Sequence, residues 1–164
     1  MTDNGEAPQI ISNDPLQLAA GASSILRGVQ RMLRDHAFAS LSEMPLANGR
    51  RADVIAVNAQ GLIWIVEIKS SIADFRTDQK WPEYREYCDA LLFAVAPDFP
   101  ASILPEDTGL ILADAYGGEI MRSAPAHPLT AARRKALLLS LAVTAARRLH
   151  AISDPPDPTI GSGL

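Results

Sequence analysis

The run of apolar residues from Asp89 to Ala96 (DALLFAVA) constrains the fold of this chain more than any other feature of its sequence. An uninterrupted apolar run of this length is typical of a β-strand that is covered on both faces. Such a strand needs packed elements on either side of its sheet. The run therefore predicts a mixed α/β sandwich, in which helices pack on the faces of a central sheet.

The segments around this run carry the patterns that such a sandwich needs. Alternating apolar residues and intervening turn residues predict five further strands, at 38–46, 51–57, 62–70, 109–114 and 119–122. Helical spacing predicts a first helix over 16–37, with Asp14 as its N-cap and Pro15 as its first residue. A second helical stretch is expected over 72–87, which Trp81-Pro82 can interrupt, and a third over 130–152, capped by Thr130.

Length and composition indicate one soluble domain. The 164 residues are 48% hydrophobic and 21% charged, which is the balance of a globular protein with a buried core. We expect a flexible lead-in over residues 1–14, one folded domain over 15–152 and a disordered tail over 153–164, where Pro and Gly are frequent.

The sequence shows no pattern for export or membrane insertion, so we expect a cytoplasmic protein. The first residues (MTDNGEAPQ) lack the basic and apolar regions of a secretory signal. The longest apolar stretch, 136–146, is shorter than the roughly 20 residues that cross a bilayer. The single cysteine, Cys88, excludes an internal disulfide and agrees with a reducing compartment.

Charged residues interrupt two of the predicted strands. Glu67 and Lys69 lie two apart in the apolar segment LIWIVEIKS and therefore project from the same face, and Asp53 interrupts RADVIAV in the same way. If Gly61 takes the left-handed position of a three-residue turn, positions 58 and 62 pair, and position 53 falls opposite position 67. The two carboxylates then share a face, with Cβ atoms roughly 5 Å apart.

Two buried carboxylates side by side are costly unless a cation neutralises them. We therefore expect a hard divalent cation, Mg²⁺ or Mn²⁺, between Asp53 and Glu67. Glu43, in the first predicted strand, is a candidate supporting acid at the same site. The alternative is an ion pair of Lys69 with Glu67 or Asp53 that has no chemical role.

The pattern Asp53…Glu67-Ile68-Lys69, on the second and third strands after an initial helix, resembles the motif of PD-(D/E)XK nucleases, with Ala52 in place of the proline. Four longer segments resemble the MmcB-related family of bacterial DNA repair proteins: GRRADVIAV, IVEIKSS, DFRTDQKWPEYREYCD and LLFAV. The resemblance covers residues 16–152. It implies a restriction-endonuclease-like α/β fold with an αβββαβ core, a central mixed sheet flanked by helices, and a role in DNA damage repair. It leaves open whether the protein cleaves DNA.

Basic residues outside the motif are candidates for contacts with DNA phosphates. They are a stripe on the first predicted helix, a pair that precedes Asp53, and a lysine in the helical segment after the third strand: Arg27, Arg31, Arg34, Arg50, Arg51 and Lys80. For each of them, a solvated surface charge is the alternative. The net charge of −4 does not decide the matter, because a local basic patch matters more than the sum.

Together these residues predict a metal-dependent nuclease that hydrolyses DNA phosphodiester bonds in DNA repair. A Mg²⁺ or Mn²⁺ ion held by Asp53, Glu67 and the Ile68 carbonyl would polarise the phosphate and lower the pKa of a bound water, which Lys69 would position. The competing interpretation is a nuclease-fold module that binds DNA or a partner protein without turnover. Asp74 and Asp78 are expected to be a helix N-cap and an exposed acid near the start of that helix.

Overall fold

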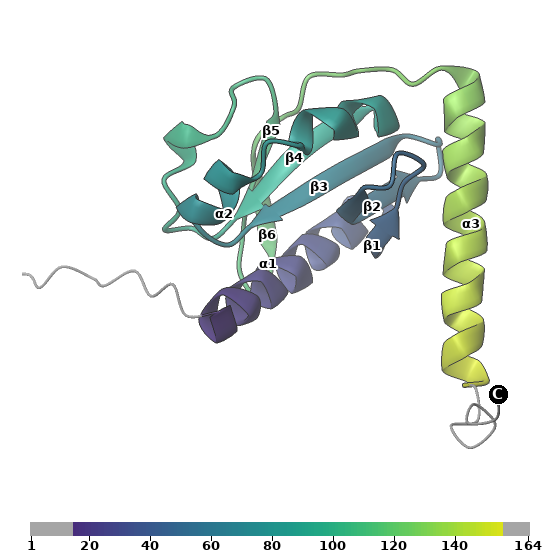
Figure 1. Ribbon diagram of the computed structural model, residues 1–164, viewed down its shortest axis with the longest axis horizontal. Helices are drawn as coiled ribbons and strands as arrows, with labels where there is room; N and C mark the ends of the chain where they lie inside the picture. Colours follow the sequence, from purple (N-terminus) through teal and green to yellow (C-terminus); the bar gives the residue numbers. More distant parts are fainter. Residues whose placement is uncertain (1–14, 156–164) are drawn as a thin grey trace, which may run out of the picture.

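The computed structural model describes residues 15–155, so the expected lead-in, the Asp14 cap and the tail from residue 156 lie outside the described residues. Its centre is a six-stranded sheet with the strand order β1-β2-β3-β4-β5-β6 (Figure 1). β1, β2 and β3 form an antiparallel meander, β3, β4 and β5 run parallel, and β6 is antiparallel to β5. The mixed α/β fold predicted from the sequence is confirmed.

Every predicted strand is present, and no strand end differs from the prediction by more than one residue. The strands are β1 Phe38–Pro45, β2 Arg51–Asn58, β3 Ile63–Lys69, β4 Ala90–Val95, β5 Gly109–Ala113 and β6 Gly118–Arg122. β4 is buried along its whole length, as its uninterrupted apolar sequence predicts.

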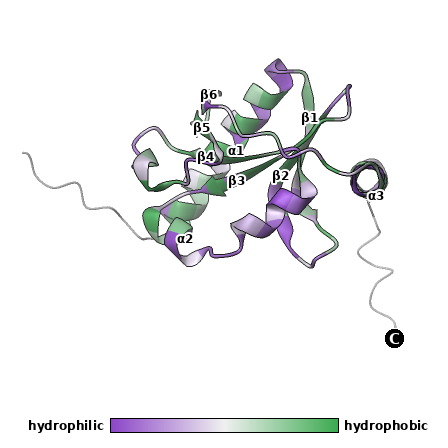
Figure 2. Ribbon diagram, turned by 90° about the horizontal axis from the view of Figure 1, so that it is seen from above, coloured by the Kyte–Doolittle hydropathy of each residue, from purple (hydrophilic) through white to green (hydrophobic). Residues whose placement is uncertain are grey.

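Helices cover both faces of the sheet. α1, Pro15–Asp35, packs its apolar stripe on one face, where Val29 and Leu33 are fully buried. The other face is covered by α2, Ile72–Thr77, and by the 3₁₀ helix η1, Trp81–Tyr87 (Figure 2). The helical stretch predicted over 72–87 is thus two helices, and the second begins at Trp81-Pro82, where proline favours a helix start. A short 3₁₀ helix η2, Ala101–Ile103, lies between β4 and β5.

The turn between β2 and β3 has the predicted form. Gly61 is left-handed with a φ of 78°, and its N–H donates to the Asn58 carbonyl at 3.0 Å. The N–H of Asn58 donates to the Leu62 carbonyl at 3.2 Å. The paired residues then run from Val57–Ile63 to Val54–Val66. One further step brings position 53 opposite position 67, which confirms the register predicted from Gly61.

The last helix, α3 Ala131–Ser153, stands beside the sheet rather than on one of its faces (Figures 1 and 2). Thr130 caps it as predicted, and the helix runs one residue into the segment that the sequence assigned to the tail. Arg134 forms an ion pair with Asp89 at 2.6 Å, and Arg148 donates to the carbonyls of Ser42 and Glu43 in β1. By length and composition α3 is also apolar enough to cross a membrane, and these contacts hold it against the folded domain.

Candidate active site

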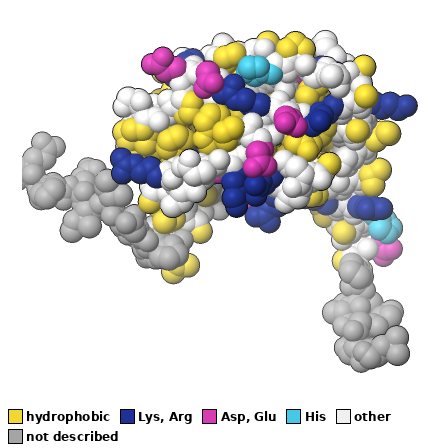
Figure 3. Space-filling model, turned by 45° about the horizontal axis from the view of Figure 1, so that its top comes forward, with side chains coloured by type: hydrophobic (Ala, Val, Ile, Leu, Met, Phe, Trp, Pro, Cys, Tyr) yellow, Lys and Arg dark blue, Asp and Glu magenta, His cyan; other side chains and the backbone are white. Residues whose placement is uncertain are grey.

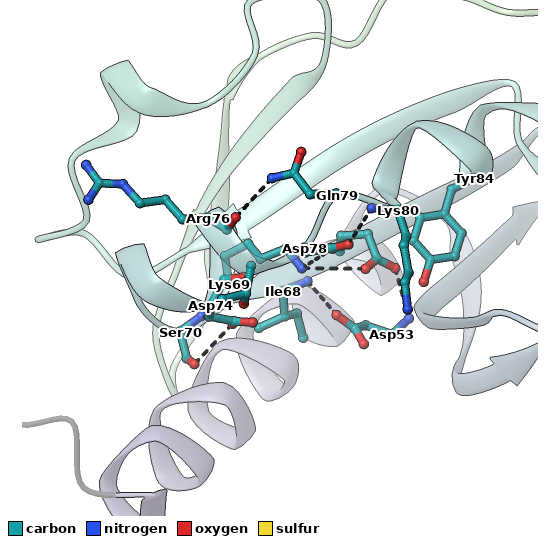
Figure 4. A network of polar contacts seen from close by, with 12 residues as sticks. Asp53, Ile68, Lys69, Ser70, Asp74, Arg76, Asp78, Gln79, Lys80 and Tyr84 are labelled. Carbon is teal, nitrogen blue, oxygen red and sulfur yellow. Dashed lines mark hydrogen bonds and ion pairs between the residues drawn. The ribbon is translucent and has the colours of Figure 1, made fainter.

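The candidate site lies where β2 and β3 separate beyond the Val54–Val66 pair. Beyond this pair, side-chain carboxylates replace backbone carbonyls as the acceptors of hydrogen bonds between the two strands. The N–H of Ile68 donates to Asp53 Oδ2 at 2.8 Å, and the N–H of Asp53 donates to Glu67 Oε1 at 3.2 Å (Figure 4). Each carboxylate is thus held by the backbone of the opposite strand. The two acids that the sequence predicted to be neighbours do lie side by side.

Lys69 lies next to these acids, but its ammonium group is not open to solvent. Its residue is 4% exposed, and its Nζ is 2.6 Å from Asp78 Oδ2 and 3.9 Å from Glu67 Oε2. Figure 4 shows Asp78 and Lys69 pointing toward one another from adjacent segments. The ion pair with Glu67 that the sequence offered as an alternative is therefore present, and a shorter one with Asp78 accompanies it.

The roles expected for Asp74 and Asp78 were wrong. α2 begins one residue after Ser71, whose hydroxyl accepts the N–H of Asp74, so Ser71 is the N-cap. The carboxylate of Asp74 accepts the N–H of Ser70 at 3.0 Å. Asp78 is the C-cap of the helix, and its side chain is only 18% exposed because it turns inward to Lys69. The six-residue length of α2 explains the error, since the chain returns to the end of β3 earlier than a longer helix would allow.

The electrostatics divide these groups into a satisfied pair and an unsatisfied pair. Burial and the nearby charge of Asp53 raise the pKa of Glu67 to about 8, and the charge of Lys69 only partly opposes them. Burial also raises the pKa of Asp53. Burial is the largest influence on the pKa of Lys69 and lowers it, but the hydrogen bond to Asp78 and the negative charges of Glu67, Asp78 and Asp74 together outweigh burial and raise it. At Asp78 burial raises the pKa, but the hydrogen bond and charge of Lys69, together with hydrogen bonds from the backbone of Lys80 and Trp81, outweigh burial and lower it. Lys69 and Asp78 thus stabilise each other as ions, whereas Glu67 and Asp53 lack a full counter-charge.

A pocket of about 350 Å³ opens beside these acids. It is lined from both sides of the sheet, because β2 and β3 have parted: Ala22, Ser23, Leu26, Glu43, Asp53, Glu67, Ile68, Lys69 and Asp74. The N–H of Ile68 points toward Asp53, and in a strand the carbonyl of the same residue points to the same side. The Ile68 carbonyl therefore lies on the side of the strand that faces Asp53.

These donors fit a hard divalent cation. Two carboxylates and one carbonyl supply oxygen only, and Mg²⁺ typically binds through one or two carboxylates while it keeps several waters. No group of three or more acidic, histidine or cysteine side chains able to hold a metal ion occurs within residues 15–155. The remaining ligands of a bound cation would therefore be water or substrate oxygens.

Glu43 lines the pocket, as expected of a supporting acid, but its carboxylate is engaged elsewhere. Its Oε2 is 2.6 Å from Nε of Arg51, and both side chains are at least half exposed. The backbone of Glu43 is left-handed, with a φ of 55°, and its carbonyl accepts a hydrogen bond from Arg148 of α3. A non-glycine residue in this conformation is uncommon, so the contact with α3 helps to fix this wall of the pocket.

The arginine stripe on α1 divides in the structure. Arg31 donates to the carbonyls of Ala115 and Tyr116. These residues lie in the turn between β5 and β6, at the edge of the sheet away from β1. Arg34 lies within 3.9 Å of Asp35, and both are exposed. Arg27 is exposed, follows the pocket residue Leu26 and has no hydrogen-bond or ion-pair partner within residues 15–155. Of the three, Arg27 alone is both next to the pocket and available for a phosphate.

The other predicted basic residues lie around the site without lining it. Arg50 forms an exposed ion pair with Glu83 at 2.8 Å. Lys80 is exposed, and its backbone N–H donates to Asp78 Oδ1 at 2.9 Å. Lys80 therefore lies next to the acid that pairs with Lys69 (Figure 4).

The sequence interpretation missed Asp78 and Tyr84 as parts of the site. The Tyr84 hydroxyl donates to the Arg51 carbonyl at 3.0 Å, which ties η1 to β2 two residues before Asp53. In the sequence, Tyr84 stands three residues from both Trp81 and Tyr87, a spacing that is typical of core packing. Asp78 had no such signal, because its contact depends on where a short helix ends.

Comparisons with known proteins agree with this fold. The family model described as DNA repair protein MmcB-like matches residues 13–156. A solved structure of the SPO1766 protein of unknown function from Silicibacter pomeroyi is 46% identical and superposes with a TM-score of 0.80, covering 88% of this chain and 96% of that one. No curated protein matches the chain. Because the family match spans all of the described residues, this chain belongs to the MmcB-like family of DNA repair proteins.

Proposed function

We propose that this protein is a nuclease that hydrolyses DNA phosphodiester bonds with the help of a bound Mg²⁺ or Mn²⁺ ion. The observation that carries the proposal is the pair Asp53 and Glu67, a half-buried acid beside a buried one, whose pKa values are both raised. A fold has no structural need for two such acids side by side, because their mutual repulsion and burial destabilise it. A cation between them removes that cost.

Each residue of the site has a role in this proposal. Asp53, Glu67 and the Ile68 carbonyl hold the cation, which when bound neutralises charge on the phosphate and activates a water for attack. Asp78 fixes the ammonium of Lys69 beside Glu67, where it adds positive charge next to the reacting phosphate. Asp53, Glu67 and Lys69 match the PD-(D/E)XK pattern residue by residue, which supports this assignment.

The DNA backbone would lie across the exposed rim of the pocket. Arg27 on α1, Arg51 on β2 and Lys80 before η1 are exposed basic residues around it. Positive charges at such positions bind phosphates without reading base sequence. The proposal therefore includes DNA as the partner, bound with little sequence preference and with a strong dependence on salt.

The test is a cleavage assay with Mn²⁺ on single-stranded, nicked, flapped and branched DNA. The wild-type protein should cut at least one of these, and Asp53→Asn should reduce the rate at least about a hundredfold. Glu119→Gln is the matched control, because Glu119 is an exposed acid on β6 away from the site, and it should cut normally. Equal cleavage by Asp53→Asn would assign the activity to a contaminant or to another site.

A second candidate function is DNA binding without turnover. It is favoured by the 2.6 Å contact of Lys69 with Asp78, since a lysine so fully paired has less charge to offer a substrate. This module would bind DNA and leave all four substrates intact. A rise in melting temperature with Mg²⁺ that disappears in Asp53→Asn would still indicate a metal site. If Mg²⁺ does not raise the melting temperature, the protein would be a DNA-binding module without a metal site.

A further inference from the structure

The outward face of α3 carries an apolar stripe that no described part of the chain covers. Ala132, Ala136, Leu139, Val143 and Ala146 follow one another at intervals of four, three, four and three residues, which is the heptad spacing of a helix-pairing seam. All five are exposed, and the two largest, Leu139 and Val143, are 58% and 47% exposed. Figure 3 shows hydrophobic and basic side chains side by side along this helix, at the right of the view.

The stripe is not needed to attach α3 to the domain. The opposite face of the helix does this, through the buried Leu137, the ion pair of Arg134 with Asp89 and the hydrogen bonds of Arg148 to β1. A pocket of about 490 Å³ borders one flank of the stripe, where Lys135 and Leu139 meet Leu129, Ala131, Arg134 and Leu138. The exposed stripe is thus left as a surface on which the apolar face of a second helix can pack.

The charges beside the stripe select the kind of helix that fits. α3 contains five Arg and Lys residues and no Asp or Glu. Arg133 and Arg134 are paired with Glu86 and Asp89, but Lys135 and Arg147 have no ion-pair partner in the described part of the chain. In the heptad, Arg133 and Arg147 flank one side of the seam and Lys135 flanks the other. We propose that this face binds an amphipathic helix of a partner protein whose narrow apolar seam is flanked by Asp and Glu residues.

The same charges disfavour a second copy of this chain as the occupant. In an antiparallel pair of α3 helices, Arg133 of one copy faces Arg147 of the other, and a parallel pair brings identical basic ends together. A lipid surface fits less well, because membrane-bound helices present Trp, Phe and Leu on a broad face. Three of the five seam residues here are alanine, and α3 contains no aromatic residue.

The test uses the full-length protein and two designed 21-residue helical peptides with the same Leu and Ala seam, one flanked by Glu and one by Lys. The Glu peptide should bind by fluorescence anisotropy at least tenfold more tightly than the Lys peptide, and its affinity should fall with added salt. Leu139→Glu should weaken this binding at least tenfold. Met121→Glu, at an equally exposed site on β6, should leave it unchanged and controls for the new charge.

Three results would overturn the proposal. Equal affinity for the two peptides would remove the charge selection on which it rests. A dimer in sedimentation that Leu139→Glu dissociates would assign the face to a second copy. Binding to phosphatidylserine vesicles that Leu139→Glu abolishes, with no binding of the Glu peptide, would assign it to an anionic membrane. None of these outcomes depends on nuclease activity.

Discussion

Two buried acids in this molecule have nearly the same exposure and opposite electrostatics. Asp89, just before β4, is 6% exposed, and Glu67, near the end of β3, is 3% exposed. Asp89 accepts hydrogen bonds from the N–H groups of Ile63 and Leu129, and Arg134 binds both of its oxygens, at 2.6 and 2.7 Å. Glu67 receives one backbone hydrogen bond and a lysine at 3.9 Å.

The consequence is a pKa lowered at Asp89 and raised at Glu67. At Asp89, burial is outweighed by the hydrogen bonds from Arg134 and the backbone. At Glu67, burial dominates and the neighbouring Asp53 adds to it. Burial alone therefore does not distinguish an acid whose charge is balanced from one whose charge is not. The distinction lies in how many donors the folded chain itself supplies.

The largest expected effect comes from breaking the ion pair between Arg134 and Asp89. Arg134→Ala leaves the buried Asp89 carboxylate without its guanidinium and should lower the free energy of unfolding by about 3–5 kcal/mol. Urea denaturation measures this. Lys135→Ala, at the next position and without an ion-pair partner among residues 15–155, is the control and should change stability by less than about 0.5 kcal/mol. A small effect of Arg134→Ala would mean that Asp89 needs only its two backbone donors.

Removing Lys69 should have two effects together. Lys69→Met leaves Asp78 and Glu67 without their cation, so the free energy of unfolding should fall by about 3 kcal/mol. Under the proposed function, cleavage should also fall roughly a hundredfold. The double variant Lys69→Met/Asp78→Asn removes both ends of the 2.6 Å pair and should regain stability but not cleavage. Recovery of cleavage in the double variant would make Lys69 a structural residue.

Glu67→Gln should stabilise the protein in the absence of divalent ions. The folded-state pKa of about 8 lies above the ordinary value of 4.5, so between these values the folded protein holds a proton that the unfolded chain releases. The contribution of protonated Glu67 to the free energy of unfolding is therefore fully present below pH 4.5 and is lost as the pH rises toward 8. Glutamine does not ionise, so at pH 8 the variant should be more stable by on the order of 2–3 kcal/mol.

Denaturation at pH 5 and pH 8, with and without Mg²⁺, measures this difference. Glu119→Gln is again the control, since an exposed acid should show no comparable gain. Mg²⁺ should recover part of the wild-type loss at pH 8 and should not stabilise Glu67→Gln to the same extent. A wild-type protein whose stability does not change between the two pH values would contradict the assignment of Glu67 as an unsatisfied acid.

The sequence predicted the parts of this comparison that depend on local pattern. The period of two in β2 and β3, together with the left-handed Gly61, was enough to place Asp53 opposite Glu67. The uninterrupted apolar sequence was enough to bury β4. These features depend on neighbouring residues and on one turn, which is why a single sequence reveals them.

The missing parts depend on contacts between distant segments. Asp89 and Arg134 are 45 residues apart, and no periodicity links them. The contact of Asp78 with Lys69 requires that α2 end after six residues, which helical spacing over 72–87 does not show. The position of α3 beside the sheet follows from Arg134 and Arg148, whose partners no local pattern in the sequence indicates.

The smallest expected effect concerns two arginines of α1, which differ in their partners as Asp89 and Glu67 do. Arg31 resembles Asp89, because two carbonyls of the β5–β6 turn already occupy its guanidinium, whereas the guanidinium of Arg27 has no partner within residues 15–155. Each phosphate contact contributes about one unit to the slope of log affinity against log salt. Arg27→Ala should therefore reduce that slope by about one and weaken binding a few-fold on every DNA sequence, measured in EDTA to prevent cleavage. Arg31→Ala should leave the slope unchanged and lower stability slightly. If the two variants weaken DNA binding equally, Arg31 must leave its carbonyl partners to bind a phosphate. Hydrogen-bond partners within the fold would then not exclude a residue from the DNA interface.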